Sequence, residues 1–72
     1  MEQYGITGEF IELHDLLKVL GFCSTGGMAK AAIAEGLVTV DGSVETRKRY
    51  KVRIGQVVQY EGRAVMVLNG VL

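Results

Sequence analysis

The chain of 72 residues lacks several features that whole classes of protein require. Its single cysteine, Cys23, cannot form an internal disulfide. Its longest apolar run, AVMVL at residues 64–68, is far too short to cross a bilayer. The acidic start, MEQYG, lacks the basic and apolar segments of a signal peptide. We therefore expect a cytoplasmic protein that makes no contact with a membrane.

The chain also lacks the residues and the room that catalysis needs. A domain of this size builds one small core, which leaves little space for a cleft walled off from water. Its only histidine, His14, lies between Glu12 and Asp15, without an evident set of further convergent ligands. We expect no catalytic residue, no metal site, no cofactor and no small-molecule substrate.

What the chain does contain is a helical pattern followed by a strand pattern. Leu13, Leu16, Leu17 and Leu20 are spaced as the buried stripe of an amphipathic helix, and Gly21 ends it. Residues 28–35 predict a second helix, with Ser24 or Thr25 as its N-cap and Gly36 at its end. Its expected buried face is made of Met28, Ala29, Ala32 and Ile33.

Beyond Gly36 the apolar period changes to two, which is typical of strands. Asp41-Gly42 and Glu61-Gly62 each stand between alternating apolar residues and predict two hairpins. The fold class expected is therefore α+β: two packed N-terminal helices followed by a small, mostly antiparallel sheet. Residues 1–8 contain Gly5 and Gly8 and are expected to form a flexible arm.

Positive charge is concentrated in one place, although eight acids balance eight bases overall. Residues 1–46 hold seven acids and two bases, a net charge of −5, and residues 47–72 hold six bases and one acid, a net charge of +5. Five of the bases lie between Arg47 and Arg53, in the sequence ETRKRYKVR at residues 45–53. Such asymmetry indicates a polyanionic partner.

If residues 47–53 are extended, alternate side chains point to opposite sides. Arg47, Arg49, Lys51 and Arg53 then share one side, and Lys48, Tyr50, Val52 and Ile54 share the other. A solvated edge strand protected from aggregation is the alternative interpretation, but two or three lysines would satisfy that need. Five cations, three of them arginine, favour a polyanion.

The order of these segments resembles the S-four RNA-binding domain, with its alpha-L motif, and in particular its small stand-alone YbcJ-like members. The resemblance rests on DLLKVLGF, MAKAAIAEG and LVTVDG, then the basic stretch and Gly55 before a final hairpin. It makes the whole chain, 1–72, one domain with its core at about 9–68. Two positions depart from the pattern, since Asp41 stands where many members have Asn, and Gln56 stands where many have Asp.

The resemblance implies non-catalytic binding of structured RNA, either ribosomal or transfer RNA, with ribosome-associated proteins as further partners. Carried over to this chain, the RNA-binding residues are Ser24, Thr25, Gly26, Gly27, Lys30, Arg47, Lys48, Arg49 and Lys51. The chemistry of a helix start agrees, because its free N–H groups and positive dipole end attract phosphate.

Two alternatives stay open at this point. Gly26 and Gly27 could serve only to let the two helices pack closely. The basic stretch could instead dock an acidic surface of a ribosome-associated complex, as a protein-interaction module. A separate motif, Gly5-Ile6-Thr7-Gly8, matches a GxxG of another RNA-binding fold, but it does not lie between helices, and we read it as chance or as part of the arm.

Overall fold

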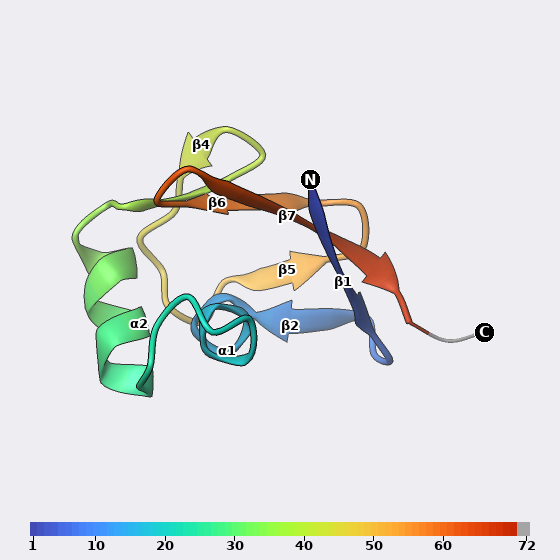
Figure 1. Ribbon diagram of the computed structural model, residues 1–72, viewed down its shortest axis with the longest axis horizontal. Coiled ribbons are helices and arrows are strands. Elements are labelled where there is room, and N and C mark those ends of the chain that lie inside the picture. The colour runs from blue at the N-terminus through green and yellow to red at the C-terminus, as the bar shows by residue number, and fades with distance from the viewer. Residues whose placement is uncertain (71–72) are drawn as a thin grey trace.

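A computed structural model describes residues 1–70 of the chain, and these form two layers around one core (Figure 1). The element order is β1 (Glu2–Ile6), β2 (Phe10–Glu12), α1 (Leu13–Val19), α2 (Gly26–Ala34), β3 (Val38–Val40), β4 (Ser43–Val44), β5 (Lys51–Arg53), β6 (Val57–Tyr60) and β7 (Arg63–Asn69). Neither helix in this part of the chain has the length and apolarity to span a membrane.

One layer is a five-stranded sheet in the order β1-β7-β6-β3-β4. The β3–β4, β3–β6 and β6–β7 pairs are antiparallel, and only β1 pairs in parallel, with β7. The other layer holds α1 and the antiparallel pair β2–β5, and α2 lies at one end of the molecule (Figure 1). The α+β class and the mostly antiparallel sheet are confirmed.

The prediction that both helices precede all strands is wrong, because β1 and β2 come before α1. Residues 2–6, expected in a flexible arm, form an edge strand along β7, from the Glu2–Val65 pair to the Ile6–Asn69 pair. An ion pair of 2.6 Å between Glu2 and Arg63 also joins β1 to β7. Backbone pairing to a distant segment leaves little trace in the local pattern, so EQYGI carried no strand signal.

The core lies between the layers and is apolar throughout, with no buried polar or charged residue among the described ones. The predicted helical stripe is confirmed: Leu13, Leu16 and Leu17 are fully buried, and Leu20 is partly buried against the core. They meet Ile33 of α2 and the valines of the sheet and of β5. Burial of each such side chain contributes about 1.5–3 kcal/mol before the entropy of folding is counted.

The two predicted hairpin turns and the predicted cap of the second helix are also confirmed. Asp41-Gly42 and Glu61-Gly62 have positive φ at both positions, as a type I′ hairpin turn requires. Thr25 is the N-cap of α2, and its Oγ1 accepts a hydrogen bond of 3.1 Å from the Met28 amide. Met28 itself was placed on the wrong face, since 54% of it is exposed.

Candidate nucleic-acid interface

The basic stretch is a turn followed by a short strand. The Tyr50 amide donates a hydrogen bond of 3.1 Å to the Arg47 carbonyl, which closes a turn over residues 47–50. Only Lys51–Arg53, which is β5, is extended. The prediction of an extended segment over residues 47–53 is therefore wrong for its first half, and Ile54, expected to face the core, is exposed.

The backbone of this turn is fixed by the start of α1. The amides of Leu13 and His14 donate to the carbonyls of Tyr50 and Lys48, at 2.9 and 3.0 Å. Glu12, the N-cap, makes no side-chain capping bond, so the turn supplies partners for two amides that a helix start leaves unsatisfied. The tertiary contact explains why a stretch without glycine or proline turns here. It also fixes the backbone from which the cationic side chains project.

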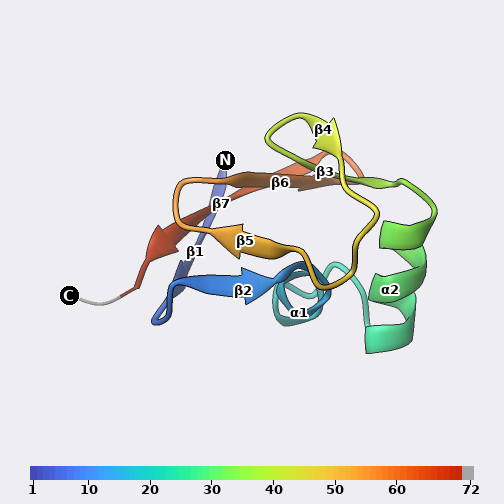
Figure 2. The same ribbon diagram turned by 180° about the vertical axis from the view of Figure 1, so that it is seen from behind.

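Four of the five cations surround one open hollow of about 450 Å³, lined by Arg47, Arg49, Tyr50, Lys51 and Arg53. We call this the basic hollow. The alternation predicted that Arg47, Arg49, Lys51 and Arg53 would share a side, and they do, although a turn and not a straight strand brings them together. Lys48, assigned to the other side, is exposed and is not part of the lining. Figure 2 shows the segment from β4 to β5 descending to the two-stranded sheet.

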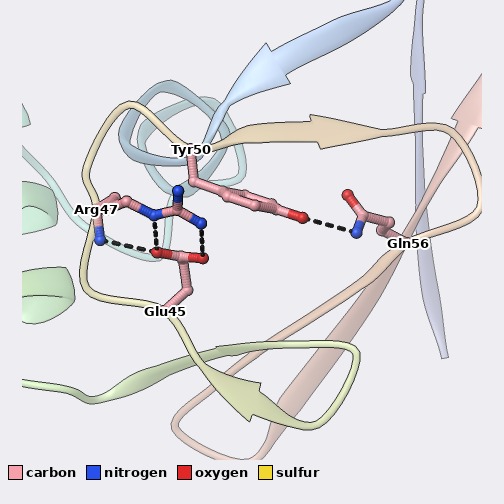
Figure 3. A network of polar contacts seen from close by, with 4 residues as sticks. All are labelled: Glu45, Arg47, Tyr50 and Gln56. Carbon is pink, nitrogen blue, oxygen red and sulfur yellow. Dashed lines mark hydrogen bonds and ion pairs between the residues drawn. The ribbon is translucent and has the colours of Figure 1, made fainter.

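Arg47 is ion-paired with a carboxylate of its own chain, although its side chain is largely exposed. Its guanidinium donates two hydrogen bonds to the Glu45 carboxylate, at 2.9 and 3.0 Å, and its amide donates a third (Figure 3). The bonds from the Arg47 side chain lower the pKa of Glu45, and the same pair raises the pKa of Arg47. Because Glu45 stays ionised, it offsets much of the positive charge of Arg47. Arg49 and Lys48 have no ion-pair partner within residues 1–70.

Tyr50 lines the hollow, and its hydroxyl is held by Gln56, one of the two positions that depart from the family pattern. The Gln56 amide nitrogen donates to the Tyr50 hydroxyl at 2.9 Å (Figure 3) and to Asp41 Oδ2 at 3.3 Å. The Gln56 side-chain oxygen accepts from the Arg53 amide at 2.9 Å. The two departures therefore contact each other.

Sequence reasoning missed an aromatic residue next to these cations. In the β2–β5 pair, Phe10 lies opposite Arg53, while Ile11 and Val52 form the next pair. Val52 is fully buried, whereas 38% of Phe10 is exposed. The Lys51 Nζ and the Arg53 guanidinium carbon lie 4.9 and 5.9 Å from the centre of the Phe10 ring. No local signal marks Phe10, because β2 and β5 are far apart in the sequence.

The predicted site residues at the start of α2 form a separate group. Ser24, Thr25, Gly27 and Lys30 are exposed, and Gly26 is half-buried. A Cβ at Gly26 would meet nothing within 4 Å, and one at Gly27 would meet only Thr25 Oγ1, at 3.9 Å. Close packing between the helices therefore does not require glycine at these positions. The first turn of α2 also contains no acid that would repel an anion.

Helix α1 separates the two groups. The basic turn caps its first residues, whereas the start of α2 follows its other end, where the amides of Phe22 and Cys23 donate to the Leu17 carbonyl. No hydrogen bond or ion pair among the described residues joins the two groups directly. A ligand that touched both would have to span α1, whose seven residues are about 10 Å long.

His14 lies between two carboxylates at the start of α1. Its Nε2 is 2.9 Å from Glu12 Oε1, and its Nδ1 is 3.5 Å from Asp15 Oδ1. The three groups could offer ligand atoms to one ion, since those atoms lie within 4.8 Å of one another. All three residues are partly buried, and acidic groups near the surface are common without a metal. We assign the group no role beyond these contacts.

Fold and surface together define a class of protein: a small α+β module that presents a cationic turn, fixed on a helix start, beside an exposed aromatic ring. The chain belongs to the S4 domain family, whose model matches residues 4–68. The match begins inside β1, five residues before the core expected from the sequence. The resemblance to the S-four domain is confirmed.

Two relatives and a solved structure place the chain within that family. YbcJ of Escherichia coli (strain K12), named as a candidate RNA-binding protein, is 55% identical over 58 residues, which cover 81% of this chain and 83% of that protein. YbcJ of Shigella flexneri shows the same identity and coverage. The solution structure of E. coli YbcJ, described as revealing an alpha-L motif involved in RNA binding, superposes with a TM-score of 0.67 at 49% identity, over 93% of this chain and 84% of that one. These matches indicate no catalytic family.

Proposed function

We propose that this protein is a non-catalytic module, formed by the whole chain, that binds structured RNA. The observation that carries the proposal is the basic hollow, in which Arg49, Lys51 and Arg53 have no carboxylate partner among the described residues. Phosphate contacts position an RNA, and a fixed arrangement of cations selects for its shape. The proposed contact residues are Ser24, Thr25, Gly26, Gly27, Lys30, Arg47, Lys48, Arg49 and Lys51, and the geometry adds Arg53.

Ribosomal and transfer RNA are the ligands we propose, since both contain folded backbone segments that a surface of this size can contact. The relatives support the proposal, because the name of one and the description of the solved structure both refer to RNA binding. On this account the protein works in the cytoplasm on or near ribosomes. An acidic protein surface is the competing ligand, because it too would be attracted by the same cations.

The start of α2 gives a test in which two effects have opposite signs. Gly27→Glu places a carboxylate where a phosphate is proposed, and the site has room for the side chain. Repulsion at close range should weaken binding of a transfer RNA or a ribosomal RNA hairpin roughly fivefold or more. The same change should raise helix stability by about 0.3–1 kcal/mol, because an acid in the first turn complements the helix dipole. Mobility shift and thermal melting measure the two effects.

Ala34→Glu is the matched control, because it adds the same charge to an exposed position at the other end of α2. RNA affinity should stay within about twofold of the parent, and stability should fall slightly, since an acid opposes the dipole there. If the parent protein bound neither RNA, the proposed function would be wrong. If Gly27→Glu bound as tightly as the parent, the helix start would have to be removed from the surface.

A further inference from the structure

Phe10 lines a second hollow of the protein surface and lies next to two cations of the basic hollow. These cations are Lys51 and Arg53, which stand over the Phe10 ring. The second hollow has a volume of about 310 Å³ and is lined by Phe10, Ile11 and residues 4–8. Phe10 itself is a large aromatic side chain that stays 38% exposed.

The second hollow is lined in part by the GxxG segment, residues 5–8, which had no role in the expected interface. Gly5 is explained by packing, because a Cβ there would come within 2.9 Å of the Gly70 Cα. Gly8 is different, since a Cβ there would meet only the Phe10 carbonyl oxygen, at 3.9 Å. The loop between β1 and β2 therefore lines the hollow without filling it at Gly8. Tyr4 lines the same hollow from β1.

From this geometry we propose that Phe10 is a stacking platform for an unpaired nucleobase of the bound RNA. The base stacks on Phe10 in the second hollow, and Lys51 and Arg53 contact the phosphates next to it. This assignment rests on the proposed RNA binding and sharpens it: the preferred ligand is a folded RNA with at least one unpaired nucleotide beside a helical backbone. Stacking on an aromatic ring with flanking cations is tolerant of base identity.

A purely structural role for these contacts is the competing explanation. Cations over an aromatic ring stabilise a strand pair even when no ligand is present, typically through the ring's negative face. That explanation predicts that replacement of Phe10 lowers thermal stability and leaves the RNA preference unchanged. Stacking predicts a loss of affinity that depends on whether the RNA has an unpaired base.

The direct probe uses a property of this chain, which has no tryptophan. Phe10→Trp places the only tryptophan of the chain at the proposed contact, and its emission can be excited separately from that of the three tyrosines. Addition of an RNA hairpin with an unpaired loop should quench and shift the tryptophan emission. Heparin, or a blunt RNA duplex of the same composition, should shift the emission slightly through Lys51 and Arg53 but quench it far less, because neither offers an unpaired base to stack on the ring. Equal quenching by all three, or none by the hairpin, would overturn the proposal.

Affinity measurements complete the test. Phe10→Leu should weaken binding of the hairpin by roughly 5- to 100-fold and of the blunt duplex by much less, and Phe10→Tyr should retain hairpin binding. Leu37→Ala is the control, because Leu37 is another exposed apolar residue outside both hollows. If the parent binds the hairpin and Phe10→Leu binds it equally well, stacking is wrong while RNA binding stands. If the parent binds no RNA, both proposals fall.

Discussion

Replacement of Arg49, Lys51 and Arg53 together by alanine should lower the affinity for structured RNA by roughly 60- to 200-fold at about 0.15 M salt. Each lost phosphate contact forgoes the release of one condensed counterion, which at this salt concentration is worth about four- to sixfold. The three side chains are the unpaired cations of the basic hollow. Mobility shift or fluorescence anisotropy with labelled RNA measures the loss.

The fold should survive this change, because all three residues are exposed. The expected cost is the loss of two cation–aromatic contacts with Phe10, about 0.5–1 kcal/mol each, and circular dichroism checks it.

Two single variants serve as controls. Lys18→Ala removes an exposed cation from the last turn of α1 and should change affinity less than twofold. Glu45→Gln frees Arg47 from its carboxylate and should strengthen binding about four- to sixfold. A folded triple variant with near-parental affinity would show that the basic hollow is not the RNA surface.

The second large effect is the dependence of affinity on salt. With four or five phosphate contacts, affinity should fall between about 0.05 and 0.2 M salt by roughly 50- to 130-fold if the contacted RNA is single-stranded, and by roughly 150- to 500-fold if it is duplex. A slope of this size follows from charge alone and should be similar for unrelated RNA sequences. Lys51→Ala, as the loss of one contact, should flatten the slope of log affinity against log salt by a little under one unit.

The salt series also tests how many cations act. A slope near zero would mean that binding does not depend on phosphate contacts, and the account would be wrong. An unchanged slope in Lys51→Ala, together with weaker binding, would place Lys51 outside the phosphate contacts and leave it only its position over the Phe10 ring.

The sequence predicted those parts of the fold that local chemistry determines. The leucine stripe of α1, the Thr25 cap and the two glycine-containing hairpin turns all follow from spacing and from positive-φ positions. Strand β1 could not be found in this way, because its partner β7 lies at the other end of the chain. The turn at residues 47–50 was missed for a related reason, since α1 imposes it through the Lys48 and Tyr50 carbonyls.

The candidate surface was predictable to the same extent. The density of cations indicated the basic hollow, and alternation grouped the four that line it, although the conformation assumed for them was wrong. Glu45 was not recognised as the partner of Arg47, and Phe10 was not recognised as a ring in contact with Lys51 and Arg53. Both errors concern contacts between side chains, and the second involves a strand pair that joins distant segments.

The central claim, that a shaped surface and not charge alone selects the RNA, is tested most directly by competition at one fixed salt concentration. The complex of the parent protein with a labelled transfer RNA or ribosomal RNA hairpin is challenged with four competitors: the same RNA unlabelled, an unstructured RNA of equal length, heparin, and an acidic protein. The account predicts that the structured RNA displaces the label at a clearly lower concentration of phosphate than the unstructured RNA, and that the acidic protein is the weakest competitor. Equal displacement by structured RNA, unstructured RNA and heparin would contradict it and reduce the site to a patch of positive charge.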